Sequence, residues 1–331
     1  MDQKRILIVR PDRLGDVVLS TPIPREIKKQ FPGSYVSILL RKYAVEVYLN
    51  NPHIDQIILL DDNSYFQKVS EIRKYNFTHS LSLIPNEPIN YMLFLAGIHC
   101  RIGVGYKLYQ FITNTKSVHR QKYNPLRHEA DYCLDLARKI GVDSNNYTTE
   151  LFLDEKEKQD VAVARNFQIR GRKHLIGIHS TSGNSAPNWS KESYRQLILE
   201  LTKQPEYSIV ITDQVKNDLF DIPGVTYPHL NLSLRESIIN FAALDMLVSN
   251  STGPMHICAA LKIKTVSMFC PLNACSPKLW GPLGNVNEIL LPKYSYCQYK
   301  CPGDPKKCTF EGEHGINVED VVEKIEAILK Q

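Results

Sequence analysis

Residues 247–271, LVSNSTGPMHICAALKIKTVSMFCP, carry the pattern that decides the fold class. Apolar runs predict a buried strand over residues 246–249 and a second over residues 265–270. Between them, a polar turn (residues 250–252) leads into a helix that begins near Gly253 and Pro254. Proline is tolerated there because an N–H in the first helical turn has no partner anyway. A strand, a helix and a second strand in this order are typical of a parallel α/β sheet.

The turn before this helix predicts an anion-binding site. Ser251, Thr252 and Gly253 place hydroxyls and backbone N–H groups around a helix N-terminus, where the helix dipole favours negative charge. The turn also follows the carboxyl end of a parallel strand, which is where open α/β sheets bind ligands. The alternative is a capped helix of a Rossmann-like fold that binds nothing.

Length and composition limit the classes of protein that need to be considered. A chain of 331 residues predicts two domains, and 43% hydrophobic with 23% charged residues is the composition of a soluble globular protein. The net charge of +5 suits an anionic substrate or a membrane surface but does not indicate nucleic acid. The N-terminal apolar run is too short for a signal peptide, and no segment reaches 18 apolar residues. We therefore expect a cytoplasmic protein that touches a membrane, if at all, from its surface.

The first strand, residues 5–10, leads into a turn that offers a carboxylate for catalysis. Neither a GxGxxG nor a GxxxxGK[ST] pattern is present. Instead, Asp16 stands at the N-terminus of a helix, flanked by Arg10 and Arg13, which we expect to keep it ionised. A carboxylate in this position can accept a proton from an alcohol, although the same cations reduce its basicity. The alternative is a helix-capping aspartate with two solvated arginines.

Strands and helices alternate along the rest of the chain, which predicts two parallel sheets covered by helices. In the first half we expect strands over residues 5–10, 35–40, 54–60, 77–83 and 101–106, and helices over residues 16–31, 44–49, 65–74, 89–95 and 128–140. In the second half we expect strands over residues 175–179 and 207–212, and helices up to Phe167, after Ser190, from a capping box at Ser233–Glu236, and over residues 318–329. The domain boundaries are placed at 1–155 and 172–316, with a C-terminal helix at 317–331.

Two further segments carry candidate binding residues. Ser180, Thr181 and Ser182 follow the first strand of the second half, and we expect their hydroxyls to donate to phosphate. The segment from residue 107 to residue 127 is basic and lacks periodicity, so it is interpreted as a loop that faces an acidic acceptor or membrane headgroups. The alternative for this segment is a solvated surface.

Three cysteines cluster late in the chain, at Cys297, Cys301 and Cys308. A metal site needs a fourth ligand, which Cys275 or His314 can supply, but the spacing matches no zinc motif. We favour reduced structural thiols over a metal site, and we expect no resident metal or cofactor.

Three groups of motifs together resemble one protein family. LIVRPDRLGDVVLSTP near the start, RIGVGY with RHEADYCLDLARKIG, and SNSTGPMHICAAL followed by TVSMFCP are similar to glycosyltransferase family 9, which includes ADP-heptose:lipopolysaccharide heptosyltransferases. The resemblance covers most of the chain in the same order. It implies a GT-B architecture, in which two Rossmann-like domains with parallel sheets face a central cleft.

The resemblance also implies a reaction and a set of site residues. The reaction is the inverting, metal-independent transfer of a sugar from a nucleotide diphosphate, heptose from ADP-heptose being the expected donor, to a hydroxyl of a lipopolysaccharide core. Asp16 is the implied general base, and Arg13, Arg41 and Lys42 are acceptor candidates by their charge. The implied donor-binding residues are Ser180, Thr181, Ser182, Ser251, Thr252, Gly253, Pro254 and His256. The expected partners are the nucleotide sugar and an anionic glycolipid, reached from the inner face of the cytoplasmic membrane, and no nucleic acid.

Three positions depart from the family pattern. Relatives commonly carry an acidic residue where this chain has Ser251, a lysine where it has Pro187, and a glycine where it has Cys270. Lys191 or Lys278 can supply the missing charge toward the diphosphate. Two alternatives therefore stay open: a transferase of the same fold that uses another nucleotide sugar, and a non-catalytic protein that binds nucleotide sugars or glycans.

Overall fold

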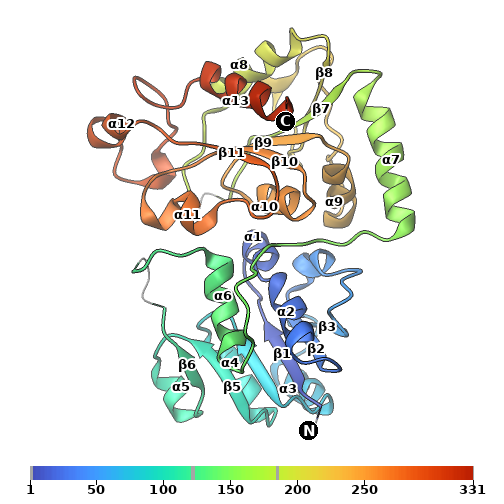
Figure 1. The fold of residues 1–331 in the computed structure, drawn as a ribbon, viewed down its shortest axis with the longest axis vertical. Coiled ribbons are helices and arrows are strands. Elements are labelled where there is room, and N and C mark those ends of the chain that lie inside the picture. The colour runs from blue at the N-terminus through green and yellow to red at the C-terminus, as the bar shows by residue number, and fades with distance from the viewer. Residues whose placement is uncertain (1–2, 121–123, 184–185, 331) are drawn as a thin grey trace. The chain divides into compact units, whose positions relative to one another are not determined.

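Buried strands alternate with helices along the chain in its computed structural model (Figure 1). The structure describes residues 3–120, 124–183 and 186–330. The chain divides into two compact units, Met1–Phe152 and Leu153–Gln331. Each unit contains one sheet whose paired strands are parallel. The expectation of two α/β halves is therefore confirmed.

The sheet of the first unit has six strands in the order β3-β2-β1-β4-β5-β6. The strands are β1 (Arg5–Val9), β2 (Tyr35–Leu40), β3 (Gln56–Leu59), β4 (His79–Ser82), β5 (Cys100–Val104) and β6 (Lys116–Val118). Strands β1 and β2 are mostly apolar along their length, as expected of strands in a parallel sheet covered on both faces. Its helices are α1 (Leu14–Val18), α2 (Pro22–Gln30), α3 (Tyr65–Lys74), α4 (Glu87–Leu95), α5 (Leu108–Ile112) and α6 (Glu129–Arg138), with a 3-10 helix η1 (Lys42–Val47).

Two sequence predictions for the first unit are wrong. The helix expected from Asp16 to Phe31 is broken into α1 and α2, because Pro22 has no N–H to continue the helical hydrogen bonds. Thr21 keeps helical backbone angles, and its N–H donates to Val18 O at 3.1 Å. The segment from residue 107 to residue 127, interpreted as a loop, contains α5 and the edge strand β6. Its missing periodicity has a local cause: in α5 the polar Gln110 is the buried residue, and its side chain bonds Val104 O and Lys107 N.

The sheet of the second unit has five strands in the order β11-β10-β9-β7-β8. The strands are β7 (His174–His179), β8 (Tyr207–Ile211), β9 (Met246–Asn250), β10 (Lys264–Met268) and β11 (Asn287–Leu290). The helices are α7 (Glu155–Ile169), α8 (Lys191–Thr202), α9 (Leu234–Ala242), α10 (Gly253–Ala260), α11 (Pro277–Trp280), α12 (Tyr294–Tyr299) and α13 (Val318–Leu329), with 3-10 helices η2 (Asp218–Phe220), η3 (Asn273–Cys275) and η4 (Pro305–Lys307). The strand, turn and helix expected around residues 246–260 are confirmed.

The helices of the second unit pack onto this sheet through their apolar faces. Val321, Ile325 and Ile328 of α13 are fully buried in the same core cluster as Ile176 of β7 and Val248 of β9. Burying a side chain of this size stabilises the fold by roughly 1.5–3 kcal/mol. Because α13 contributes to this core, the C-terminal helix is an integral layer of the second unit.

Candidate functional site

Asp16 lies in the first turn of α1, directly after β1. The chain leaves β1 toward β2 on one side and later returns as β4 on the other side, so the loop after β1 is at the point where the strand order reverses. In an open parallel sheet this point forms the ligand-binding crevice. The topology therefore places the candidate base at the edge of the sheet where a substrate is expected.

Arg10, the residue after β1, is a buried hub for three carboxylates. Its guanidinium contacts Asp12 Oδ1 at 3.0 Å, Asp16 Oδ1 at 2.7 Å and Glu129 Oε1 at 3.4 Å, and it also donates to the carbonyls of Asp16 and Leu83. Only 1% of its side chain is exposed. A buried arginine must be paired on every side, and these contacts fix the orientation of Asp16 relative to the sheet.

Burial dominates the titration of the two aspartates beside Arg10. It raises the pKa of Asp16 above its ordinary value, against the opposing effect of Arg10, and Glu129 adds to the rise. It raises the pKa of Asp12 to about 6, again against Arg10 and with help from Asp16. The sequence-based expectation that the neighbouring arginines leave Asp16 a weaker base is therefore wrong, because desolvation of the carboxylate outweighs their attraction. A raised pKa makes Asp16 a better proton acceptor.

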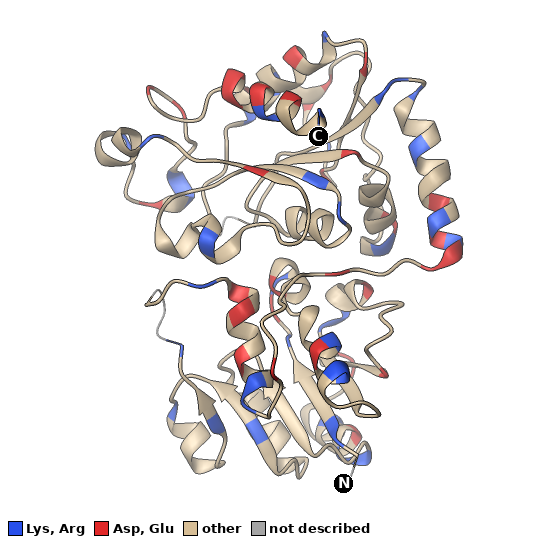
Figure 2. Ribbon diagram, in the orientation of Figure 1, with Lys and Arg blue, Asp and Glu red and all other residues tan. Residues whose placement is uncertain are grey.

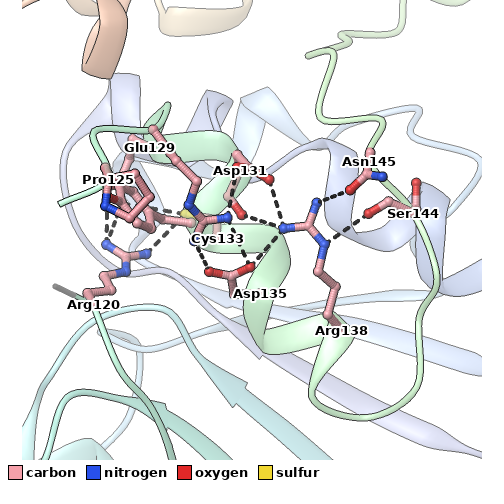
Figure 3. Close-up of polar contacts among 11 residues, drawn as sticks. Arg120, Pro125, Glu129, Asp131, Cys133, Asp135, Arg138, Ser144 and Asn145 are labelled. Atoms are coloured by element: carbon pink, nitrogen blue, oxygen red, sulfur yellow. Dashed lines mark hydrogen bonds and ion pairs between the residues drawn. The ribbon is translucent and has the colours of Figure 1, made fainter. Parts of the chain in front are cut away.

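Helix α6 closes this cluster with a second set of charges (Figure 3). Arg120 donates to both oxygens of Glu129, at 2.8 and 3.1 Å, and contacts Cys133 Sγ. Arg127 pairs with Asp131 and Asp135 along the outer face of α6. Two of the basic residues expected to face an acceptor are thus neutralised within the unit, and Lys122 lies outside the described residues.

The three acceptor candidates Arg13, Arg41 and Lys42 are exposed at the edge of the sheet that carries Asp16. Arg13 is the N-cap residue of α1 without a side-chain cap bond, and its charge opposes the rise in the pKa of Asp16. Arg41 Nε donates to Pro11 O at 3.1 Å, which holds it beside the loop after β1. The neighbouring Tyr43 hydroxyl donates to Asp12 O. Exposed cations therefore follow β1 and β2 at this edge of the sheet, and the charge of Arg13 acts on Asp16.

In the second unit, the loops after β7, β8 and β9 lie at the carboxyl edge of the sheet. The strand order reverses between β7 and β9, which are paired neighbours. Asn188 donates to Ser180 O at 3.0 Å, and Asn250 donates to Asn188 Oδ1 at 2.7 Å and to the Tyr194 hydroxyl at 2.9 Å. These hydrogen bonds from side-chain amides connect the turn after β7 to the turn after β9. The predicted donor residues of the two segments are thereby brought to one edge.

Asp213, which sequence reasoning missed, organises the turn after β7. Its buried carboxylate accepts from the N–H and hydroxyl of Ser180 and from the N–H and hydroxyl of Thr181, at 2.6 to 3.1 Å. The hydroxyl protons of Ser180 and Thr181 therefore point at Asp213. These two hydroxyls are therefore engaged within the unit, while Ser182 is half-buried and Gly183 is exposed at the end of the turn.

The turn after β9 presents a helix N-terminus with unsatisfied groups. Thr252 is the N-cap of α10 but makes no side-chain cap bond, and among the described residues its buried Oγ1 has no hydrogen-bond partner. Ser251, Gly253 and Pro254 are half-buried, and His256 is buried one turn into the helix. First-turn N–H groups have no acceptor within their own helix. This edge thus offers hydrogen-bond capacity suited to an anionic ligand.

Two other histidines of the second unit, His179 and His229, are held neutral by their surroundings. Burial lowers the pKa of His179, whose Nδ1 contacts Thr212 Oγ1 at 3.0 Å, although Asp213 opposes the shift. Burial lowers the pKa of His229 to about 3, and its ring lies 4.5 Å from that of Phe241. Neither histidine supplies positive charge at neutral pH.

The positions that depart from the family pattern, and the lysines that can replace the missing charge, lie in the second unit and differ in burial. Pro187 is buried, and the following Trp189 donates from Nε1 to Ile316 O at 3.0 Å. Ser251 is half-buried beside the helix N-terminus. Lys191, at the first position of α8, and Lys278, in α11, are both exposed.

The structure contains no disulfide among its eight cysteines. Cys308 is buried beside the Tyr296 hydroxyl, and Cys275 lies in the core with Cys270. Among the described residues, no three His, Cys, Asp or Glu side chains are arranged to hold a metal ion. Within the same residues, no helix has the length and hydrophobicity needed to cross a membrane.

Simple sequence signals were available for the residues that were missed. Asp213 follows a buried strand by two positions, and parallel strands bring their carboxyl ends to one edge. Arg10 follows a buried strand, so it is expected to need counterions, and Asp12 and Glu129 are among them. Which of the 35 acidic residues would fill that role depends on the strand order, which the sequence pattern does not contain.

Comparison with known proteins agrees with this geometry. The model of glycosyltransferase family 9 (heptosyltransferase) matches residues 89–307. A lipopolysaccharide heptosyltransferase 2 of Escherichia coli strain K12 is 21% identical, and the alignment covers 99% of both chains.

Solved structures of the family share the fold. A glycosyltransferase family 9 structure from Veillonella parvula superposes with a TM-score of 0.80 at 19% identity, covering 99% of this chain and 98% of that chain. The structure of the E. coli ADP-heptose lipopolysaccharide heptosyltransferase II superposes with a TM-score of 0.77 at 17% identity, covering 99% of both chains. The GT-B fold class is therefore confirmed. Because the family model spans well over half of the chain, the protein belongs to glycosyltransferase family 9 and is a glycosyltransferase.

Proposed function

We propose that this glycosyltransferase moves a sugar from a nucleotide diphosphate onto a hydroxyl of a lipopolysaccharide core acceptor, with inversion and without a metal ion. Heptose from ADP-heptose is the donor that its relatives support, since the E. coli neighbour is described as an ADP-heptose lipopolysaccharide heptosyltransferase. The observation that carries the proposal is Asp16, a carboxylate of raised pKa at the switch point of the first sheet.

In the proposed step, Asp16 accepts the proton of the acceptor hydroxyl as that oxygen attacks the anomeric carbon. The new carbon–oxygen bond forms on the face opposite the diphosphate, and the old bond breaks with its electron pair going to the diphosphate oxygen. Arg10, 2.7 Å from Asp16 Oδ1, holds the carboxylate in place while it gains the proton. The raised pKa brings the base closer to the operating pH, which is favourable for proton transfer.

The proposed donor site is the carboxyl edge of the second sheet. The N-terminus of α10, with Ser251, Thr252, Gly253, Pro254 and His256, stabilises the negative charge that develops on the leaving diphosphate. Ser182 donates to a phosphate oxygen, while Ser180 and Thr181, held by Asp213, shape the turn and offer acceptor lone pairs.

The proposed acceptor site is the edge of the first unit around Asp16. Arg13, Arg41 and Lys42 attract an anionic glycolipid to this edge. We assign the acceptor to the domain of residues 1–155, the donor to the domain of residues 172–316 and a covering role to the helix at 317–331. A glycolipid acceptor places the enzyme at the inner face of the cytoplasmic membrane.

A second candidate is the same transfer from another nucleotide sugar. Ser251 and Pro187 favour it, because they remove an acidic and a basic side chain where family members commonly have them. A non-catalytic binder of nucleotide sugars or glycans is the third candidate.

Thermal unfolding with ADP-, UDP-, GDP- and CMP-linked sugars and the bare nucleotides tests these candidates. A ligand present at 100 times its Kd stabilises the fold by about 2.7 kcal/mol, which gives a measurable rise in Tm. A larger rise with ADP-heptose than with ADP supports heptose transfer, and a rise with another sugar nucleotide replaces the donor. Binding without transfer to any lipopolysaccharide acceptor would refute the enzymatic proposal for this site.

A further inference from the structure

A group of large apolar side chains is exposed on α4 and α5 of the first unit. We call this group the α4–α5 apolar surface. Its members, with their exposed fractions, are Phe94 (46%), Leu95 (42%), Leu108 (76%), Phe111 (85%) and Ile112 (60%). The two helices are in contact, and α5 lies beside the edge strand β6 (Figure 1). Contiguous exposed apolar patches are uncommon on soluble monomers and mark interaction sites.

Helix α5 buries a polar side chain and exposes apolar ones, the opposite of the usual arrangement at a protein surface. Its polar Gln110 is 3% exposed, and the adjoining Thr113 is 1% exposed. Thr113 Oγ1 accepts from Asn90 Nδ2 of α4 at 2.6 Å, which anchors the polar face of α5 inward. Leu108, Phe111 and Ile112 are thereby held outward. The apolar face is fixed by buried hydrogen bonds and does not reflect a loosely attached helix.

A buried cation without a carboxylate partner lies beneath this surface. Arg101 of β5 is 7% exposed, donates to the carbonyls of Ile98 and Thr113, and lies 5.1 Å from the ring centroid of Phe94. No carboxylate pairs with it within the described part of the chain, and its Nε there has no acceptor. A buried charge is normally paired, so this one leaves a net positive charge behind the apolar surface.

The surrounding sequence is basic and contains no acid. Residues 88–128 include six lysines and arginines and no aspartate or glutamate. Lys107 and Lys116 flank α5 and are exposed, and Arg73 of α3 is exposed and donates to Leu95 O. Figure 2 shows blue and no red along the segment from α5 to β6. Glu87 and Glu129 border this segment in the sequence, and Glu87, at the start of α4, contributes to raising the pKa of Tyr109.

We propose that the α4–α5 apolar surface docks on an anionic lipid bilayer. Leu108, Phe111 and Ile112 enter the boundary between headgroups and acyl chains, while Lys107 and Lys116 contact the phosphates. The combination of exposed apolar side chains with a rim of one charge sign matches a bilayer surface, which is apolar below and negative above. A second copy of this chain would place two positive rims against each other.

This inference extends the membrane-side placement in the proposed function and is independent of the donor sugar. The experiment is co-sedimentation of the full chain with phosphatidylcholine vesicles that contain or lack phosphatidylglycerol. Binding is expected only with phosphatidylglycerol, and it is expected to weaken with added salt. Equal binding to both vesicle types, or no binding to either, overturns the proposal.

Paired variants connect the binding to the surface. Phe111→Asp is expected to weaken vesicle binding by roughly tenfold, because it places a charge where an apolar ring enters the bilayer. Phe66→Asp is the matched control, since Phe66 is 76% exposed near the start of α3 in the same unit and follows Asp61 and Asp62 in the sequence. Vesicle binding of this variant is expected to be unchanged. Equal loss in both variants contradicts the assignment.

Charge variants and the oligomeric state complete the test. Lys107→Gln and Lys116→Gln are each expected to weaken binding by about fivefold, the effect of one basic residue at an anionic surface. Light scattering that showed a dimer in the unmodified chain and a monomer in Phe111→Asp would assign the surface to a second copy and overturn the lipid proposal. Because the variants leave the donor edge intact, their Tm rise with nucleotide sugar is expected to be unchanged, so failure of docking is distinguishable from failure of the proposed function.

Discussion

Replacing Asp16 by asparagine separates the proposed base from every other role of the site. The side chain keeps its size and one oxygen that accepts from Arg10, at 2.7 Å in the unmodified chain, but it loses the ability to take a proton. General-base catalysis typically contributes about 10²–10⁴-fold to the rate. The expected loss of kcat is therefore about 10²–10⁴-fold, equal to about 2.7–5.4 kcal/mol in activation free energy.

The same variant is expected to be at least as stable as the unmodified protein at pH 8. Burial raises the pKa of Asp16 in the folded state, so the folded protein holds this proton more tightly than the unfolded chain. Ionised Asp16 then opposes folding once the pH exceeds the folded pKa, and this contribution disappears at a pH below the ordinary value of 3.8. The Asp16→Asn substitution removes the opposing charge, so loss of activity is not expected to come with loss of Tm.

The assay measures transfer from the donor found by thermal unfolding, as a function of pH. The kcat/KM of the unmodified chain is expected to fall about tenfold per pH unit below the pKa of Asp16, at a pH higher than an exposed aspartate would give. Asp61→Asn is the matched control, because Asp61 is an exposed carboxylate in the same unit that bonds Lys42 N. Activity of Asp16→Asn within tenfold of the unmodified enzyme would refute the assignment of the base.

Three further predictions concern the residues that position the site. Arg10→Met leaves Asp12, Asp16 and Glu129 without their shared cation, so it is expected to lower the free energy of unfolding by about 3–5 kcal/mol at pH 8. Urea titrations should show a smaller loss at pH 5, below the pKa of about 6 of Asp12; an equal loss would contradict the electrostatic explanation. Asp213→Asn places an amide donor against the N–H groups of Ser180 and Thr181. It is expected to lower the free energy of unfolding by about 1.5–3 kcal/mol and to weaken binding of the donor sugar nucleotide. An unchanged affinity for that nucleotide in calorimetry would exclude a role of Asp213 in shaping the donor turn. Gly177→Ala places a Cβ 2.6 Å from Leu244 Cδ1 and 3.1 Å from Thr212 Cγ2, so a loss of about 1–3 kcal/mol is expected in urea, and no loss would show that Leu244 can move aside.

The sequence by itself determined the local elements of this protein. The turn and helix at Gly253–Ala260, the capping box at Ser233 and Glu236, and the last helix Val318–Leu329 are as predicted. These features depend on hydrogen bonds and apolar spacing within a few residues, which a single segment contains completely. The alternation of strand and helix then required parallel sheets, because parallel strands need a crossover between them.

Only the tertiary structure decided which charges surround the candidate base. Glu129 contacts Arg10 from 119 residues away and pairs with Arg120, and both charges act on the pKa of Asp16. Asp213 contacts Ser180 from 33 residues away. The strand order of each sheet creates these neighbours, and many orders fit the same succession of apolar runs. Burial itself also comes from packing, so the raised pKa of Asp16 was opposite to what its sequence neighbours indicated. A local pattern specifies which groups a segment offers, whereas their solvation and partners depend on elements that arrive from elsewhere in the chain.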